Sequence, residues 1–245
     1  RGLRIASAPL APSPSKLCIT LPPLRLLTEM SSIDQVVAGI FEAEEIDVSD
    51  KKLGDAGVKK LADAIEKGTS ATELYFDGNQ VTDAGAAAVA KALKNNSTVM
   101  MVSFMQNQIS DDGAAELAKV IGRSSTLVEV DLRDNDIGDK GAEALAKALE
   151  LNGTLKKIYL KDNRIGDAGA QAFARAMRKN TVLKQLDLEV NAISKPGVDA
   201  LLEAAAATRK EITCGYQESG FRATGYRKEG STQEVVESSS KGWIF

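Results

Sequence analysis

The acidic stretch at residues 131–139 holds the side chains whose types and spacing come nearest to a chemical site. Asp131, Asp134, Asp136 and Asp139 cluster around a glycine, as the ligands of a calcium-binding loop do. An EF-hand loop, however, needs its turn glycine and its bidentate glutamate at fixed positions, and no frame of this stretch supplies both. We therefore predict no metal site, and we expect each of these acids to have a structural role.

Catalytic groups of other kinds are also missing from the sequence. The chain contains no histidine, which excludes a Ser–His–Asp triad, a Cys–His pair and any histidine-ligated metal site. It contains neither a GxxxxGKS/T phosphate loop nor a strand-linked GxGxxG motif, so a nucleotide site has no support. Carboxylates do lie near one another, but their regular recurrence indicates a surface column rather than an acid/base pair. The sequence predicts a protein that is not an enzyme and binds no cofactor.

The composition is that of a globular, weakly acidic chain. Of its 245 residues, 43% are hydrophobic and 27% are charged, and the formal net charge is −3. A generic nucleic-acid binder would be basic, so we expect no nucleic-acid partner. Cys18 and Cys214 are too few and too far apart for a disulfide framework, which predicts a reducing, cytoplasmic location. No apolar run is long enough to span a membrane.

Two residue types recur through the chain at a constant spacing of 28 residues. The asparagines are Asn79, Asn107, Asn135, Asn163 and Asn191. The glycines are Gly57, Gly85, Gly113, Gly141, Gly169 and Gly197. Six units of this length fill residues 43–210, and copies that stay in phase over this distance indicate a repeat protein.

Each unit encodes a short strand followed by a helix. In the fourth unit, apolar Val130 and Leu132 flank a polar residue, which is the alternation of a strand with one buried face. Asp139 precedes the helix, where its carboxylate can accept hydrogen bonds from free N–H groups. Neither element can bury its apolar face within one unit, so we predict that the units stack into a solenoid. The apolar helix positions of this unit are Ala142, Leu145, Ala146 and Leu149.

The recurring asparagines are predicted to form a structural ladder inside the turns. After each strand the chain bends and leaves backbone N–H and C=O groups without sheet partners. An amide side chain both donates and accepts hydrogen bonds, so a column of asparagines can satisfy these groups between neighbouring units. The first unit has Lys51 at this position, which suits a unit with solvent on one side.

The repeat pattern resembles leucine-rich repeats, specifically the 28-residue subtype of ribonuclease-inhibitor-like proteins. The resemblance covers about two-thirds of the chain. It implies an α/β fold, namely a right-handed horseshoe solenoid with a parallel β-sheet on the concave face and helices on the convex face. The resemblance also implies an interaction module or scaffold, because a concave solenoid surface is the usual binding surface of such repeats.

The concave face of the predicted sheet is therefore the surface to examine for a partner. Because side chains alternate along a strand, three side chains of each unit project onto this face. They include eight acids and three bases, so the face carries a net charge of −5. The eighteen positions are Glu45, Asp47, Ser49, Glu73, Tyr75, Asp77, Met101, Ser103, Met105, Glu129, Asp131, Arg133, Lys157, Tyr159, Lys161, Gln185, Asp187 and Glu189.

Two methionines interrupt this charged face. Met101 and Met105 lie beside Tyr75 of the neighbouring unit, with acids on both sides. Such a patch is typical of a binding site, with adaptable apolar contact at its centre and polar specificity around it. The alternative is that scattered apolar surface residues are ordinary and need no partner. The candidate partner-binding residues are Tyr75, Asp77, Met101, Met105, Glu129, Asp131, Arg133 and Tyr159.

The N-terminal part of the chain differs from the repeats. Residues 30–42 are predicted to cap the first repeat, through an amphipathic helix over about 32–43. Residues 1–29 contain five of the six prolines and no acid before Glu29. Two interpretations of this disordered segment stay open: unstructured sequence upstream of the true start, or an organelle-targeting segment.

The C-terminal part begins as a decayed repeat. Residues 211–225 are interpreted as a degenerate half-repeat with an edge strand over 211–217. In this alignment Cys214 follows Leu186 by 28 residues. Residues 226–245, which are rich in Gly, Ser, Lys and Glu, are predicted to form a mobile tail.

The most direct functional interpretation is a non-enzymatic protein–protein interaction module. We expect its partner to present a basic or amphipathic segment to the concave face, and we expect a monomer outside that complex. Two alternatives stay open. The same repeat subtype occurs in the Ran GTPase activator, which implies a GTPase-activating protein. The segment Asn96–Phe104 resembles the corresponding repeat of tropomodulin-like proteins, which implies an actin-filament regulator.

Overall fold

A computed structural model describes residues 33–216, 221–225 and 238–239, in which helices and strands alternate along the chain. The described helices are α1 (Ile33–Gly39), α2 (Gly54–Lys67), α3 (Asp83–Leu93), α4 (Asp111–Ile121), α5 (Asp139–Leu151), α6 (Asp167–Lys179) and α7 (Lys195–Thr208). The described strands are β1 (Glu45–Asp47), β2 (Glu73–Tyr75), β3 (Met101–Ser103), β4 (Glu129–Asp131), β5 (Lys157–Tyr159), β6 (Gln185–Leu188), β7 (Glu211–Tyr216), β8 (Phe221–Gly225) and β9 (Ser238–Ser239).

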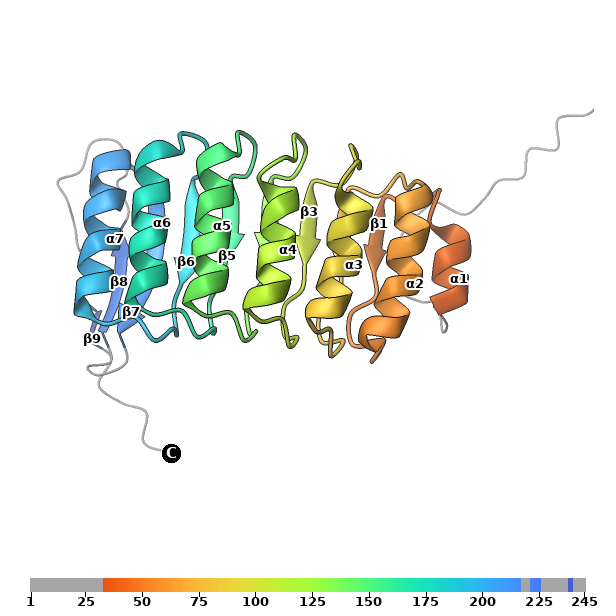
Figure 1. Ribbon diagram of the computed structural model, residues 1–245, viewed down its shortest axis with the longest axis horizontal. Coiled ribbons are helices and arrows are strands. Elements are labelled where there is room, and N and C mark those ends of the chain that lie inside the picture. Colours follow the sequence, from red (N-terminus) through yellow and green to blue (C-terminus); the bar gives the residue numbers. More distant parts are fainter. Residues whose placement is uncertain (1–32, 217–220, 226–237, 240–245) are drawn as a thin grey trace, which may run out of the picture.

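The strands form one open sheet that follows chain order from β1 to β9. The strands from β1 to β7 pair in parallel, whereas β8 and β9 add to the C-terminal edge in antiparallel pairs. Partners in the first six strands are one repeat apart, as Ile46 lies opposite Leu74 and Leu74 opposite Val102. The helices stand side by side in one layer in front of the sheet (Figure 1). The structure thus confirms the predicted solenoid of parallel strands alternating with helices.

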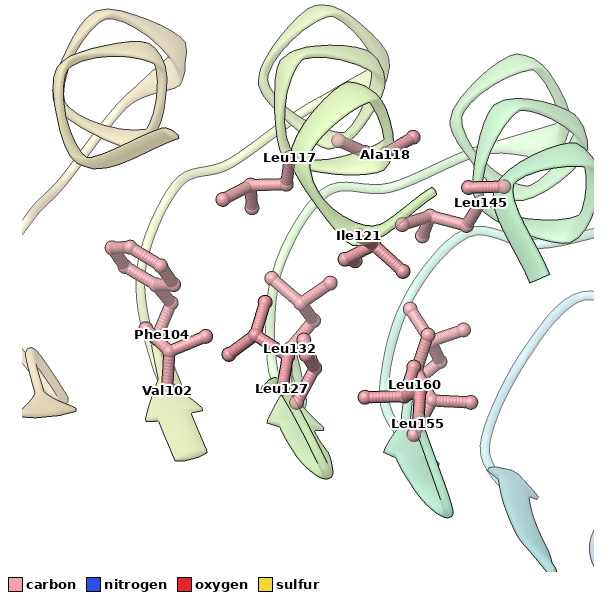
Figure 2. Close-up of a cluster of buried hydrophobic side chains, with 14 of the residues drawn as sticks. Val102, Phe104, Leu117, Ala118, Ile121, Leu127, Leu132, Leu145, Leu155 and Leu160 are labelled. Atoms are coloured by element: carbon pink, nitrogen blue, oxygen red, sulfur yellow. The ribbon is translucent and has the colours of Figure 1, made fainter. Parts of the chain in front are cut away.

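The hydrophobic core lies between the sheet and the helix layer. In the fourth repeat, Leu132 after the strand and Leu145 in the helix are both 0% exposed. Figure 2 shows Phe104, Leu132 and Leu160 after successive strands, with the side chains of the helices packed above them. Neighbouring repeats also touch directly, since the rings of Phe76 and Phe104 stack with their centroids 5.0 Å apart. Each repeat therefore completes the core of its neighbours, as stacking requires.

The recurring asparagines connect each turn to the repeat before it. The Oδ1 of Asn135 accepts a hydrogen bond from the backbone N–H of Ile109 at 2.9 Å. Its Nδ2 donates to the carbonyl oxygen of Phe104, also at 2.9 Å. Asn163 makes the equivalent bonds to Ile137 and Leu132 of the fourth repeat. These side chains therefore bind adjacent repeats together and also close the turn of their own repeat, as Asn135 Nδ2 does through the carbonyl oxygens of Leu132 and Arg133.

The aspartate in the first turn of each helix from α2 to α6 caps the next helix rather than its own. Asp139 is the first residue of α5, and its Oδ1 accepts from the N–H groups of Gly166 and Gly169 at 2.8 Å each. The expectation that Asp139 caps its own helix is therefore wrong. A Cβ at position 169 would lie 3.0 Å from Asp139 Oδ1 and 2.7 Å from the Cβ of Ala142. Glycine recurs at this place because the carboxylate of the preceding repeat approaches the backbone so closely.

The C-terminal repeat is shorter than the constant spacing predicts. Leu186 pairs with Ile212 and Leu188 pairs with Cys214, so the offset falls to 26 residues. The loop between α7 and β7 is very short, because Arg209 turns the chain in a left-handed conformation with φ of 58°. The predicted alignment of Cys214 with Leu186 is therefore wrong. The strand predicted over 211–217 does form, as β7 (Glu211–Tyr216), but it is not an edge strand, since β8 pairs with it on its outer side.

At the N-terminal end, α1 is shorter than the helix predicted over 32–43. It ends at Gly39, a poor residue for a helix interior, and the chain then turns into β1. Val36 and Ile40 are 3% and 0% exposed, and α1 packs against α2. The expectations for residues 1–29, and for most of 226–245, lie outside the described residues.

The residue before each ladder position has a left-handed backbone conformation. Positive φ is favourable for glycine and tolerable for asparagine and aspartate, whereas a β-branched residue is strained there. Val190 is the β-branched case, with φ of 53°, and its side chain is 41% exposed, so burial compensates little for the strain. The positions in this column are Asp50, Gly78, Gln106, Asp134, Asp162 and Val190.

Replacing Val190 with asparagine should stabilise the protein. We expect the free energy of unfolding to rise by about 1 kcal/mol, because asparagine adopts this conformation with less strain. Urea denaturation followed by circular dichroism measures the change. Val190→Ala is the matched control, since it removes the branch but keeps a Cβ that cannot bond locally. An asparagine variant no more stable than the alanine variant would contradict this explanation.

Candidate functional site

The open sheet face is the side of the sheet that the helix layer leaves uncovered (Figure 1). It carries the eighteen side chains from Glu45 to Glu189 that the strand alternation predicts. In β2, for example, buried Leu74 lies between the partly exposed residues Glu73 and Tyr75. Strand pairing then stacks equivalent side chains in columns across the sheet, so that Glu73 lies beside Met101.

In the C-terminal half of this face, Arg133 contacts two neighbouring side chains, Asp131 and Tyr159. Its Nε donates to Oδ1 of Asp131 at 3.0 Å, and its guanidinium lies 5.5 Å from the centre of the Tyr159 ring. The hydrogen bond to Asp131 raises the pKa of Arg133. Asp131 itself is only 4% exposed. Asp131 and Arg133 therefore hold each other in place, and Asp131 offers a partner little accessible surface.

The two lysines of this half are paired in the same way. Lys157 lies 2.9 Å from a carboxylate oxygen of Glu129, and Lys161 lies 3.3 Å from one of Glu189. The hydrogen bond to Glu129 raises the pKa of Lys157. Exposed pairs of this kind contribute little to stability, but they do cancel charge. The last three repeats hold four acids and three bases on this face, which leaves a net charge of only −1.

The N-terminal half of the open sheet face is different, because its first three repeats supply no base to it. Glu45, Asp47, Glu73 and Asp77 give this half a net charge of −4. Tyr75 donates its hydroxyl to Oε2 of Glu73 at 2.6 Å. Burial, together with this bond, raises the pKa of Tyr75. Most of the net negative charge of the face, −4 of −5, is therefore concentrated on its first three repeats.

Asp77 joins this acidic area to the third repeat. It accepts hydrogen bonds from the Ser103 hydroxyl at 2.5 Å and from the Met105 N–H at 2.9 Å. Burial raises the pKa of Asp77, and these two bonds partly offset the increase. The repulsion of Asp47 and Asp131 acts in the same direction as burial. The carboxylate thus fixes the backbone at Met105 while it stays part of the acidic surface.

Tyr75, Met101 and Met105 form what we term the Met–Tyr patch. All three are partly exposed, and they belong to neighbouring repeats at β2 and β3. Ser103, between the two methionines, is 2% exposed, so it contributes little of the accessible surface there. The patch offers flexible, polarisable thioethers and an aromatic ring directly beside four carboxylates. This arrangement can bind an apolar side chain and a positive charge at the same time.

The eight candidate residues divide between two places in the structure. Tyr75, Asp77, Met101 and Met105 lie together in the N-terminal half, whereas the others lie in the charge-balanced half. Tyr159 is separated from the Met–Tyr patch by β4, and its hydroxyl donates to Oε1 of Gln185 at 3.3 Å. The sequence reasoning left Glu45, Asp47 and Glu73 out of the candidate site. The sequence could have identified them, because the first three repeats have no lysine or arginine at the open-face positions.

Other kinds of site find little support in the part of the chain that the structure describes. Over residues 33–216 and the two short C-terminal strands, no three Cys, Asp or Glu side chains are placed to hold a metal ion. None of the helices described there is long and apolar enough to cross a membrane.

Comparison with known proteins agrees with this architecture. A family model described as "Leucine Rich repeat" matches residues 72–90, 95–118, 123–146, 152–174 and 179–202. These matches fall on the second to sixth repeats and include parts of β2 to β6 and of the helices that follow them. A search of curated proteins finds no match.

Solved structures of other repeat proteins are similar to this chain. The tropomodulin C-terminal domain of Caenorhabditis elegans is 15% identical, with 62% of this chain and 92% of that domain covered and a TM-score of 0.53. The actin-binding site 2 of leiomodin-1 is 18% identical, covering 72% and 89% of the two chains, with a TM-score of 0.48. An internalin from Listeria monocytogenes is 16% identical, covering 71% and 54%, with a TM-score of 0.36. At 15% identity, the similarity to the tropomodulin domain is one of fold alone.

Proposed function

The chain is a leucine-rich-repeat solenoid, and on this basis we propose that it is a non-enzymatic protein-interaction module of the 28-residue, ribonuclease-inhibitor-like subtype. Its partner is a protein with a basic, amphipathic segment. That segment binds across the first three strands of the open sheet face, with its apolar side chains on the Met–Tyr patch. The observation that carries the proposal is the asymmetry of the face, where apolar contact and uncompensated negative charge coincide at one end.

Charge complementarity supports the choice of a basic segment. A lysine or arginine of the partner would meet the carboxylates of Glu73 and Asp77 beside the patch and that of Glu45 one strand farther on. Such attraction mainly speeds encounter and selects the partner, whereas affinity comes from apolar side chains buried at the centre. In the C-terminal half of the face, three of the four carboxylates already pair with a base: Asp131 with Arg133, Glu129 with Lys157 and Glu189 with Lys161.

The rigidity of the scaffold also favours binding. Met105 and its neighbours sit at the end of a strand that is hydrogen-bonded to strands on both sides. Side chains carried by a rigid sheet lose less conformational freedom on binding than side chains carried by a flexible loop. The methionine side chains supply the adaptability that remains, because their unbranched thioethers can adjust to different apolar surfaces.

Removing the apolar centre tests this function. In Met101→Ser/Met105→Ser we expect capture of the partner to fall by roughly tenfold, because the apolar contact is lost while the sheet stays intact. Neutralising two of the acids near the Met–Tyr patch, in Glu45→Gln/Glu73→Gln, should weaken capture of the partner and make that capture less sensitive to salt. The measurement is affinity capture from cell extract with the tagged protein, followed by quantitative mass spectrometry of each variant.

Met100→Ser provides the matched control for this experiment. Met100 is 47% exposed but lies in the loop just before β3, outside the Met–Tyr patch, so its loss should leave capture unchanged. Thermal melting should place all the variants close to the parent protein. Undiminished capture by the double serine variant would remove the Met–Tyr patch from the binding site.

The two alternative functions lead to activities that capture alone does not measure. A Ran-activator-like protein would accelerate single-turnover GTP hydrolysis by a Ran-type GTPase. A tropomodulin-like protein would co-sediment with actin filaments or cap their ends. The fold of the tropomodulin C-terminal domain makes the second assay worthwhile, although that likeness concerns the fold alone.

A further inference from the structure

A second surface of the protein has the opposite charge to the open sheet face. It is formed by the segments at the C-terminal ends of α3, α4, α5 and α6 and the loops that follow these helices, namely residues 94–100, 122–128, 150–156 and 178–184, which we term the loop edge. These segments contain six bases and a single acid, Glu150, which gives a net charge of +5. The bases are Lys94, Arg123, Lys156, Arg178, Lys179 and Lys184.

Four of these bases are available to a ligand. Lys179 pairs with Glu150 at 2.8 Å and Arg178 with Glu203 at 3.3 Å. The other four bases are all exposed, and within the described ranges none of them makes a salt bridge. Within the described residues, the loop edge therefore carries four exposed bases that form no salt bridge.

An apolar groove runs along the same edge. It has a volume of about 450 Å³ and crosses several repeats, with Met100, Val128 and Val182 as its large apolar side chains. Thr126, Thr154 and Lys156 also line the groove. Met100 is 47% exposed, so it is open to contact. Apolar and basic groups therefore occur together at this edge.

A second set of amide side chains holds these loops in position. Asn152 Nδ2 donates to the carbonyl oxygen of Ile121 at 2.7 Å, and Asn180 Nδ2 donates to that of Leu149 at 2.7 Å. Each bond ties one loop to the helix end of the repeat before it. The stacking of the repeats therefore fixes the distance between neighbouring loops, and the groove is preorganised for a ligand.

We propose that the loop edge is a second docking surface, which binds an acidic protein segment carrying apolar side chains. Glutamates or aspartates of the segment meet Arg123, Lys156 and the neighbouring bases, while its apolar side chains enter the groove at Met100. A protein segment fits better than a nucleic acid, because the groove lining contains no aromatic ring for base stacking.

This surface is independent of the proposed function of the open sheet face. The two surfaces share no residue and select partners of opposite charge, one basic and one acidic. With both surfaces occupied, the protein would join two different proteins across its width.

Binding of an acidic probe tests the loop edge directly. The probe is a fluorescein-labelled peptide of repeated Glu-Glu-Glu-Leu units, and its fluorescence anisotropy is followed as the full chain is added. We expect saturable binding that Arg123→Glu/Lys156→Glu weakens by roughly tenfold, because two attractive contacts become repulsive. Met100→Ser should weaken it by a few-fold, since the groove loses its most exposed apolar side chain.

A charge-matched control separates this site from general electrostatic attraction. Lys140→Glu/Lys147→Glu changes the net charge by the same amount on the exposed surface of α5, so it should leave binding within about twofold of the parent. Equal weakening by both double variants, or no saturable binding of the peptide, would overturn the proposal. So would tighter binding of single-stranded DNA or of phosphatidylserine vesicles that the same Arg123→Glu/Lys156→Glu change abolishes. All the substituted side chains are exposed, and unchanged melting curves confirm that each variant is folded.

Discussion

Replacing Leu132 with aspartate is expected to divide the solenoid into two parts that unfold separately. Leu132 is 0% exposed and lies between Phe104 and Leu160 of the adjacent repeats (Figure 2). Its backbone N–H donates to the carbonyl oxygen of Tyr159 at 2.9 Å, so the residue also joins the fourth repeat to the fifth. A carboxylate at this point would be desolvated without a partner, at a cost of roughly 3 kcal/mol or more.

The division follows from the one-dimensional character of the stack. Each repeat contacts only its neighbours, so a defect in the centre removes the coupling between the blocks on its two sides. Urea denaturation followed by circular dichroism should change from one transition to two. Leu151→Asp is the matched control, because that leucine is 76% exposed and its loss should leave one transition. A single cooperative transition near the parent midpoint in the Leu132→Asp protein would contradict the account.

Replacing Asn135 with alanine is expected to have the second-largest effect. The side chain makes four hydrogen bonds: it accepts from Ile109 N–H and donates to the carbonyl oxygens of Phe104, Leu132 and Arg133. It is only 8% exposed, so water replaces these partners poorly. We expect the free energy of unfolding to fall by about 3 kcal/mol, at the upper end of the cost of buried, unsatisfied polar groups.

Urea denaturation also measures this change, with Asn95→Ala as the control. Asn95 is an exposed loop residue, and its replacement should alter the free energy of unfolding by no more than about 0.5 kcal/mol. If Asn135→Ala were equally mild, the ladder would not bind the repeats together. Asn135→Asp keeps the acceptor but places a carboxylate against three carbonyl oxygens, so it should be at least as destabilising as the alanine variant.

The solenoid itself was predictable because each unit repeats the same local pattern. Alternation around Val130 and Leu132 requires a strand, and the helical spacing that follows requires a partner for its apolar face. Six copies make stacking the simplest way to bury those faces. The constant spacing also predicts the parallel register, in which Leu74 lies opposite Val102. Periodicity carries this information because it repeats the same physical requirement many times.

The departures from the prediction occur where one local change breaks the period. Asn180 is followed in the next repeat by Lys210, which is 7% exposed and whose Nζ donates to the carbonyl oxygen of Met177 at 2.6 Å. Burial lowers the pKa of this lysine. Because Lys210 takes the structural place that Asn180 has in the preceding loop, the sequence does not show that the two loops are equivalent. The loop before β7 is also shorter, so Cys214 pairs with Leu188 rather than with Leu186.

Contacts between repeats were the other part that the sequence concealed. Nothing in the spacing of Asp139 shows whether it caps its own helix or the next one, because both N-termini lie within one repeat of it. Likewise, the net charge of the open sheet face does not show that Arg133 and Asp131 neutralise each other. Such pairings depend on side-chain geometry across the sheet. The pairing of Glu129, Asp131 and Glu189 with bases, which leaves the carboxylates of the first three repeats without ion-pair partners among the described residues of this face, is therefore visible only in the structure.

Methionine oxidation in the captured complex is the most direct test of where the partner binds. The protein is treated briefly with hydrogen peroxide, free and in complex, and sulfoxide at each methionine is measured by tandem mass spectrometry. We predict that the partner slows oxidation of Met101 and Met105 by severalfold, while exposed Met100 reacts at its free rate. Equal oxidation rates at Met101 and Met105 in the free protein and the complex would show that the partner binds elsewhere.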